Sequence, residues 1–125
     1  MKQVFVSYVF EDKGFRTQLE RWAADGKLGA VQISGEHQDL RQKGEAAIRN
    51  HLVPLLAGAA VLIVLVGDNS HNHEWVAYEA DVMQSARKPV LVMRIPGTHG
   101  APPPSIRHLP ELAFEAEALR RAIGS

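Results

Sequence analysis

The run Val61-Leu62-Ile63-Val64-Leu65-Val66 constrains the fold of this chain more than any other stretch. Six consecutive apolar residues, most of them β-branched, leave a strand with no polar face. Such a strand must be covered on both sides, which is typical of the centre of a parallel sheet with helices on each face. Gly67-Asp68-Asn69 follows at once and marks the end of the strand.

Strand-like and helix-like patterns alternate along the rest of the chain. Strands are predicted at residues 4–6, 30–33, 90–93 and 112–114. Helices are predicted at 13–24, 44–57, 73–86 and 115–123, with Pro54 an irregularity in the second of them. This alternation predicts a doubly wound α/β protein, a flavodoxin-like five-stranded parallel sheet in the order 2-1-3-4-5, in one domain over residues 1–125. Residues 34–43 are polar and are expected to form a long loop.

In that strand order, ligands bind outside the carboxyl ends of the first and third strands. The sequence places Ser7, Tyr8 and Phe10 after one strand, and Asp68 and Asn69 after the other. We expect these residues to contact a substrate, with Ser7 and Tyr8 at a ribose and Phe10 against a base. The plainer alternatives are that Tyr8 packs, Ser7 caps a turn, and Phe10 covers the core.

Capping is the simpler role for the acidic residues near the same edge. Asp68, Asn69 or Ser70 can cap the helix that follows, and Glu11-Asp12 reads as a solvated N-terminal cap of the first helix. His71 and His73 have no third identifiable ligand, so we expect no metal site. The Gly-x-Gly-x-x-Gly pattern of dehydrogenases and the P-loop are both absent from the sequence, and no cofactor is expected.

Composition excludes several classes of partner. The 125 residues carry 14 basic and 14 acidic side chains and a formal net charge of zero, which argues against nucleic acid and anionic membranes. There is no cysteine, so thiolate catalysis and disulfides are excluded. The N-terminus lacks a signal-peptide layout, and the apolar run over 55–66 is broken by Gly58 and too short to span a bilayer. We therefore expect a cytoplasmic protein.

The stretch Glu74-Trp75-Val76-Ala77-Tyr78-Glu79 carries the strongest chemical signal. Trp75 and Glu79 are four residues apart, so on a helix they lie on one face. A carboxylate beside a large aromatic side chain, at the top of a parallel sheet, suits chemistry at the ribose of a sugar nucleotide. Glu79 is then expected to be ionised and partly desolvated, with Trp75 as a dry wall. The alternative is a solvated glutamate beside a tryptophan that anchors the core.

These residues together resemble TIR (Toll/interleukin-1 receptor) domains. Val4-Phe5-Val6-Ser7-Tyr8 with Glu11-Asp12 is similar to the opening box of that family. The strand 61–66 with Gly67, followed by the Trp75–Glu79 box, is similar to its third strand and next helix. The resemblance extends to 88–97 and is closest to the bacterial TIR-like group of the ThsB proteins of Thoeris anti-phage defence. It covers residues 2 to about 97. The loop at 34–43 departs from the family in having only Gly35 and no proline.

The resemblance implies cleavage of the nicotinamide–ribose bond of NAD, with NAD as substrate and Glu79 as the catalytic residue. It further implies an ADP-ribose-derived signal nucleotide, either a cyclic isomer or a conjugate, which a separate effector senses. Members commonly form homo-oligomers or TIR–TIR assemblies, in which the loop at 34–43, with Arg41 and Lys43, would complete a neighbour's site.

Two rival interpretations remain open from the sequence. One is a non-catalytic TIR module that acts as an assembly adaptor, for which Glu79 would have no use. The other is a phosphoacceptor receiver domain, in which Asp68 would be the acceptor. The receiver is disfavoured because no acidic pair directly follows the first strand and no lysine ends a later one.

Overall fold

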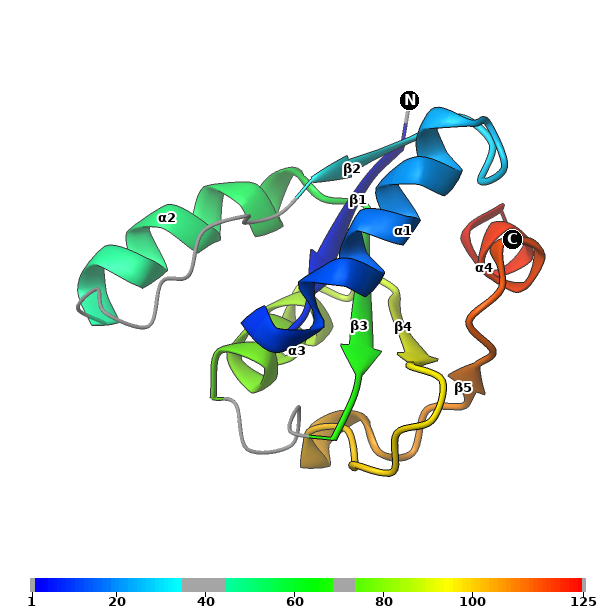
Figure 1. Cartoon of the computed structure of the whole chain (residues 1–125). Coiled ribbons are helices and arrows are strands. Elements are labelled where there is room, and N and C mark those ends of the chain that lie inside the picture. The colour runs from blue at the N-terminus through cyan, green and yellow to red at the C-terminus, as the bar shows by residue number, and fades with distance from the viewer. Residues whose placement is uncertain (1, 35–44, 69–73, 125) are drawn as a thin grey trace.

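The computed structural model describes residues 2–34, 45–68 and 74–124, and strands alternate with helices through them (Figure 1). The strands are β1 (Lys2–Ser7), β2 (Val31–Ser34), β3 (Val61–Val66), β4 (Val90–Arg94) and β5 (Glu111–Leu112). The helices are α1 (Lys13–Ala24), α2 (Glu45–Gly58), α3 (Glu74–Ser85) and α4 (Ala116–Gly124), with short 3-10 turns η1 (Phe10–Asp12) and η3 (Pro104–Ile106).

All five strands are parallel and lie in the order β2-β1-β3-β4-β5. The predicted flavodoxin-like α/β fold is therefore confirmed. In the register of the two central strands, Ser7 of β1 is opposite Val64 of β3. The chain reverses its winding direction between these two strands, so the crevice of the sheet opens where β1 and β3 end.

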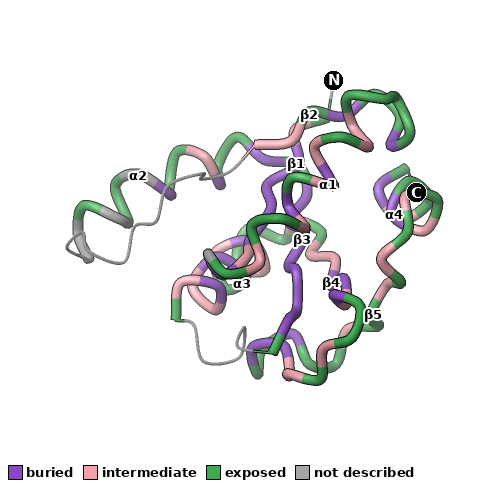
Figure 2. Tube along the Cα trace, in the orientation of Figure 1, coloured by how far each residue is buried: buried purple, intermediate pink, exposed green. Residues whose placement is uncertain are grey.

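Two apolar cores cover the sheet, one on each face. Residues of α2, α3 and η3 pack on one face, around Phe5, Leu62 and Val64. Residues of α1 and α4 pack on the other, around Val6 and Ile63. Every residue of β3 is buried, as the continuous purple strand in Figure 2 shows. This two-sided burial is the reason that its sequence lacks any polar position.

The predicted element boundaries are wrong by a residue or two at several places. β5 is Glu111–Leu112 and not 112–114, because the strand is short and a charged residue opens it. The Glu111 carboxylate accepts two hydrogen bonds from Arg94 of β4, at 2.7 and 3.0 Å, and this pair holds the edge strand in place. Ser34, predicted to open the polar loop, ends β2 instead, where its hydroxyl donates to the carbonyl of Val4 at 3.3 Å. Helix α2 continues through Pro54.

The loop predicted at 34–43 otherwise lies outside the described residues. In residues 2–34, 45–68 and 74–124, none of the helices has the length and apolar character needed to cross a membrane.

Candidate active site

Three loops meet at the carboxyl edge of the sheet, around Gly67. A Cβ atom added to Gly67 would lie 2.6 Å from Oδ2 of Asp12, so the Asp12 side chain packs directly on this glycine. On the segment after β4, a Cβ on Gly100 would lie 2.2 Å from the carbonyl oxygen of Gly67 and 2.6 Å from that of Asp68. Thr98 adds a hydroxyl hydrogen bond of 3.3 Å to the Val66 carbonyl. These contacts fix the backbone at the end of β3.

Gly100→Ala is expected to destabilise the protein by about 1–3 kcal/mol, because the added methyl group meets backbone atoms that cannot rotate away. Chemical denaturation followed by circular dichroism measures the change. Gly14→Ala is the matched control, since nothing lies within 4 Å of its added Cβ and its helical position favours alanine. A Gly100→Ala protein as stable as the Gly14→Ala protein would contradict the close approach.

Glu79 lies in α3 and is buried, with 7% of its surface exposed. Ser7, at the end of β1, is 1% exposed, and its hydroxyl donates a hydrogen bond of 2.6 Å to Oε1 of Glu79. The structure thus brings together two of the predicted site residues, which are 72 positions apart in the chain. The alternative of a solvated Glu79 is wrong. A direct contact of Ser7 with substrate stays a prediction.

Burial raises the pKa of Glu79 to about 8, and the hydrogen bond from Ser7 opposes this shift. At such a pKa the protonated form of the carboxyl group is favoured in the free protein at neutral pH. The physical reason is desolvation: in the described residues no cation forms a salt bridge with Glu79 that would favour its charged form. The burial of Glu79 agrees with the expected desolvation, and its ionisation during the reaction stays a prediction. A buried acid with so shifted a pKa is characteristic of functional sites.

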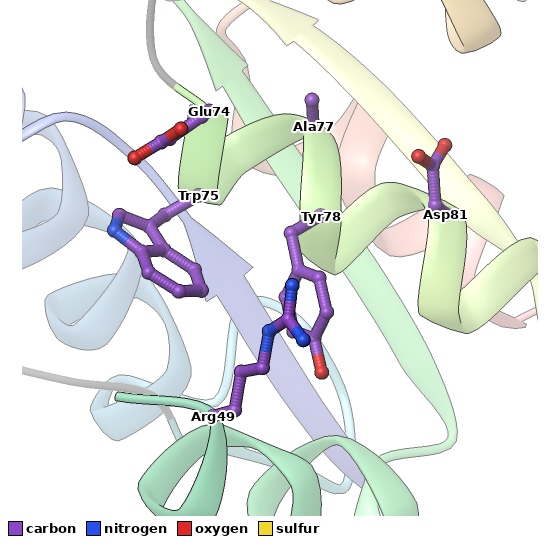
Figure 3. Close-up of a pocket in the computed structure, with 6 residues that line it drawn as sticks. All are labelled: Arg49, Glu74, Trp75, Ala77, Tyr78 and Asp81. Atoms are coloured by element: carbon purple, nitrogen blue, oxygen red, sulfur yellow. The ribbon is translucent and has the colours of Figure 1, made fainter. Parts of the chain in front are cut away.

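Trp75 is half-buried at the start of α3 and packs against the core that α2 and α3 share. Its ring meets the Tyr78 ring edge to face, with centroids 5.5 Å apart. The guanidinium of Arg49, from α2, lies 5.4 Å from the centre of the Tyr78 ring. Figure 3 shows the three side chains gathered between the two helices. A role for Trp75 beside substrate stays a prediction.

These side chains line an open groove of about 280 Å³ between α2 and α3. Glu74, Ala77 and Asp81 complete its lining, whereas Glu79 does not contribute to it. The groove therefore does not include the buried carboxyl group of Glu79.

Tyr8 is separated from Ser7, although the two are adjacent in the chain. Successive side chains of a strand point to opposite faces of the sheet, and Tyr8 packs against the core of α1 and α4. The Arg16 guanidinium lies 5.8 Å from the centre of its ring. Phe10 falls in η1, and its side chain is outside the described part of the structure.

The predicted cap of α1 is not formed by Asp12, while capping of α3 by Asp68, Asn69 or Ser70 stays a prediction. Asp12 occupies the N-cap position of α1 without a side-chain capping hydrogen bond, and its Oδ2 is buried without a hydrogen-bond partner in the described residues. Burial raises the pKa of Asp12, and the nearby Glu11 and Asp68 carboxylates add to the shift. Asp68 accepts a 2.9 Å hydrogen bond from the backbone N–H of His99, which ties the end of β3 to the loop after β4. Asn69, with Ser70, His71 and His73, lies outside the described residues.

Sequence reasoning missed Arg49 and Tyr78 as neighbours of Trp75. Tyr78 is three residues after Trp75, and this spacing on a helix was a usable signal. No sequence signal identified Arg49, because its position beside Tyr78 depends on how α2 packs against α3.

The all-parallel sheet in the order 2-1-3-4-5, with helices on both faces, defines a flavodoxin-like α/β protein. The sequence model of the family described as Thoeris protein ThsB, TIR-like domain, matches residues 5–100. The chain belongs to this family, and the resemblance noted in its sequence is confirmed. None of the curated proteins matches it.

Proposed function

We propose that this protein cleaves the nicotinamide–ribose bond of NAD and releases an ADP-ribose-derived signal nucleotide in anti-phage defence. Glu79 is the catalytic residue. The observation that carries the proposal is the burial of Glu79, a residue only 7% exposed, with its carboxyl group hydrogen-bonded to Ser7 at the end of β1. A buried carboxyl group is unfavourable for folding, and a catalytic role accounts for its presence.

The bond between nicotinamide and ribose breaks when nicotinamide leaves as a neutral molecule with the bonding electron pair. The ribose carbon then carries positive charge in an oxocarbenium-like state. A carboxylate close to that carbon stabilises the charge, as in glycoside hydrolysis. Water as nucleophile yields ADP-ribose and a proton, whereas attack by the adenine of the same molecule yields a cyclic isomer. A second acceptor yields a conjugate.

NAD itself favours the active form of Glu79. Its nicotinamide ring is positively charged before cleavage, and an opposite charge nearby lowers the pKa of a carboxyl group. Substrate binding thus promotes ionisation of a residue that is mostly protonated in the free protein. Trp75 supplies an apolar wall, and Phe10, Asp68 and Asn69 contact the nucleotide at the carboxyl edge.

The product acts through a separate effector that senses the nucleotide. The protein works as a homo-oligomer or TIR–TIR assembly, with the loop at 34–43 completing the site of a neighbouring copy. Chemistry at the ribose needs no resident cofactor, and NAD is the substrate.

The rate of the reaction is expected to depend on pH through Glu79. Because kcat/KM reports the free enzyme, it falls about tenfold for each pH unit below the Glu79 pKa of about 8. The midpoint for kcat lies lower, since bound NAD favours the carboxylate. Initial rates of nicotinamide release between pH 5.5 and 9.5 measure both profiles. A kcat/KM that is constant between pH 6 and 8 would contradict an essential Glu79 carboxylate that titrates near pH 8 in the free protein.

Liquid chromatography with mass spectrometry of infected cells tests the product. Cells that produce the wild type are expected to lose NAD and accumulate a new ADP-ribose-derived species, and cells that produce Glu79→Gln are not. Free ADP-ribose as the sole product would reduce the proposal to a simple NAD hydrolase. Protection against phage by both proteins without NAD loss would favour the assembly adaptor.

A further inference from the structure

We propose that Ser7 is a positioning residue for Glu79. The Ser7 hydroxyl holds Oε1 of Glu79, so that Oε2 of Glu79 is the oxygen that acts on the substrate. This inference rests on the proposed function, because it assigns Ser7 a part in the same reaction. It also replaces a direct substrate contact by Ser7 with an indirect role.

The hydrogen bond has the geometry of a strong interaction. Its length of 2.6 Å between Oγ of Ser7 and Oε1 of Glu79 lies at the short end of the range for a hydroxyl donor and an oxygen acceptor. The described residues include three buried polar or charged side chains, Ser7, Arg16 and Glu79, and two of the three form this bond.

The sheet gives Ser7 a rigid base. Ser7 is the last residue of β1 and is held in register with Val64 of β3 at the centre of the sheet. Phe5, two residues earlier, faces the core of α2 and α3, and strand alternation directs Ser7 to the same side. A group on a central strand positions a neighbour more accurately than a group on a loop.

Two arginines on the elements packed against α3 interact with groups other than Glu79. On the elements packed against α3, Arg49 of α2 lies over the ring of Tyr78, and Arg94 of β4 pairs with Glu111. Two influences set the pKa of Glu79: burial, which raises it, and the Ser7 hydroxyl, which lowers it. Removing the hydroxyl leaves burial unopposed, so both the orientation and the ionisation of Glu79 change.

Ser7→Ala is expected to lower kcat for NAD cleavage roughly 10- to 100-fold, the equivalent of one hydrogen bond to a charged group. KM changes less than about threefold, because Ser7 does not touch the substrate. Ser7→Thr keeps the hydroxyl and is expected to recover most of the rate. Ile63→Val is the control for lost packing, since Ile63 belongs to the core on the opposite face of the sheet and should keep wild-type kcat.

A second measurement does not depend on turnover. The titration of Glu79 is followed by NMR of protein with ¹³C-labelled glutamate carboxyl groups, with Glu79→Gln assigning the signal. In Ser7→Ala the midpoint is expected to rise, because the hydrogen bond that opposes the effect of burial is lost, and in Ile63→Val it is expected to stay in place. A Ser7 that merely satisfies a buried hydroxyl would leave kcat and the midpoint unchanged on removal, and that result would overturn the proposal.

The two measurements together separate this inference from the function on which it rests. If the midpoint shifts but neither wild type nor variant cleaves NAD, the proposed function fails, and with it the catalytic part of the role of Ser7. If the wild type cleaves NAD and Ser7→Ala does so at the same kcat, the function stands and the positioning role fails.

Discussion

Glu79→Gln is expected to be more stable than the wild type at alkaline pH, by an amount that grows as the pH rises from 5 to 8. The substitution keeps the shape of the side chain and the carbonyl oxygen that accepts the hydrogen bond from Ser7. It removes only the capacity to ionise in a buried place.

The direction follows from proton binding in the two states. The native protein holds the proton of Glu79 up to a pKa of about 8, whereas the unfolded chain loses it near the model value of 4.5. Between these values the native state binds more protons than the unfolded state, so the free energy of unfolding falls as pH rises. Below pH 4.5 both states are protonated, and above pH 8 both are ionised. The unfolding free energy therefore changes with pH through Glu79 only within this window, and the loss of stability persists above it.

The difference in unfolding free energy between Glu79→Gln and wild type is expected to increase by roughly 3–4 kcal/mol between pH 5 and pH 8. Urea denaturation of both proteins at several pH values measures it. Other titrating groups affect the two proteins alike and cancel in the difference. A difference that stays constant with pH would mean that Glu79 is already ionised in the native state at pH 5.

The fold was predictable because its signals are local. Six consecutive apolar residues predict that β3 is buried on both faces. The alternation of strands and helices along the chain then allows few topologies. The short β5 was misplaced because its two residues are defined by long-range pairing with β4 and not by an apolar pattern. Ser34 was assigned to a loop for the same reason: its role in β2 comes from pairing with β1.

The candidate site was only partly predictable. Strand ends and the helix after β3 located Ser7 and Glu79 at one edge, but their mutual hydrogen bond depends on how α3 packs on β1. The direction of Tyr8 follows from strand alternation, a signal that was available and unused. The protonation state of Glu79 could not be predicted from the sequence, because desolvation depends on how the protein packs and not on the residue or its neighbours in sequence.

Loss of NAD cleavage in Glu79→Gln is the largest effect expected of any single substitution. A neutral amide cannot stabilise the positive charge that develops on the ribose as nicotinamide leaves, and removal of one such interaction lowers rates by roughly 100- to 1,000-fold. The variant is expected to fold at least as well as wild type, so its loss of activity cannot come from unfolding. Glu117→Gln, which changes an exposed carboxylate on α4, should cleave NAD at the wild-type rate.

The decisive measurement is the initial rate of nicotinamide release from NAD at pH 8, in extracts of phage-infected cells containing equal amounts of each protein. Wild type and Glu117→Gln are expected to release nicotinamide at the same rate, and Glu79→Gln at least about 100-fold more slowly. Equal release by wild type and Glu79→Gln, or none by either folded protein, would contradict the assignment of Glu79 as the group that breaks the bond.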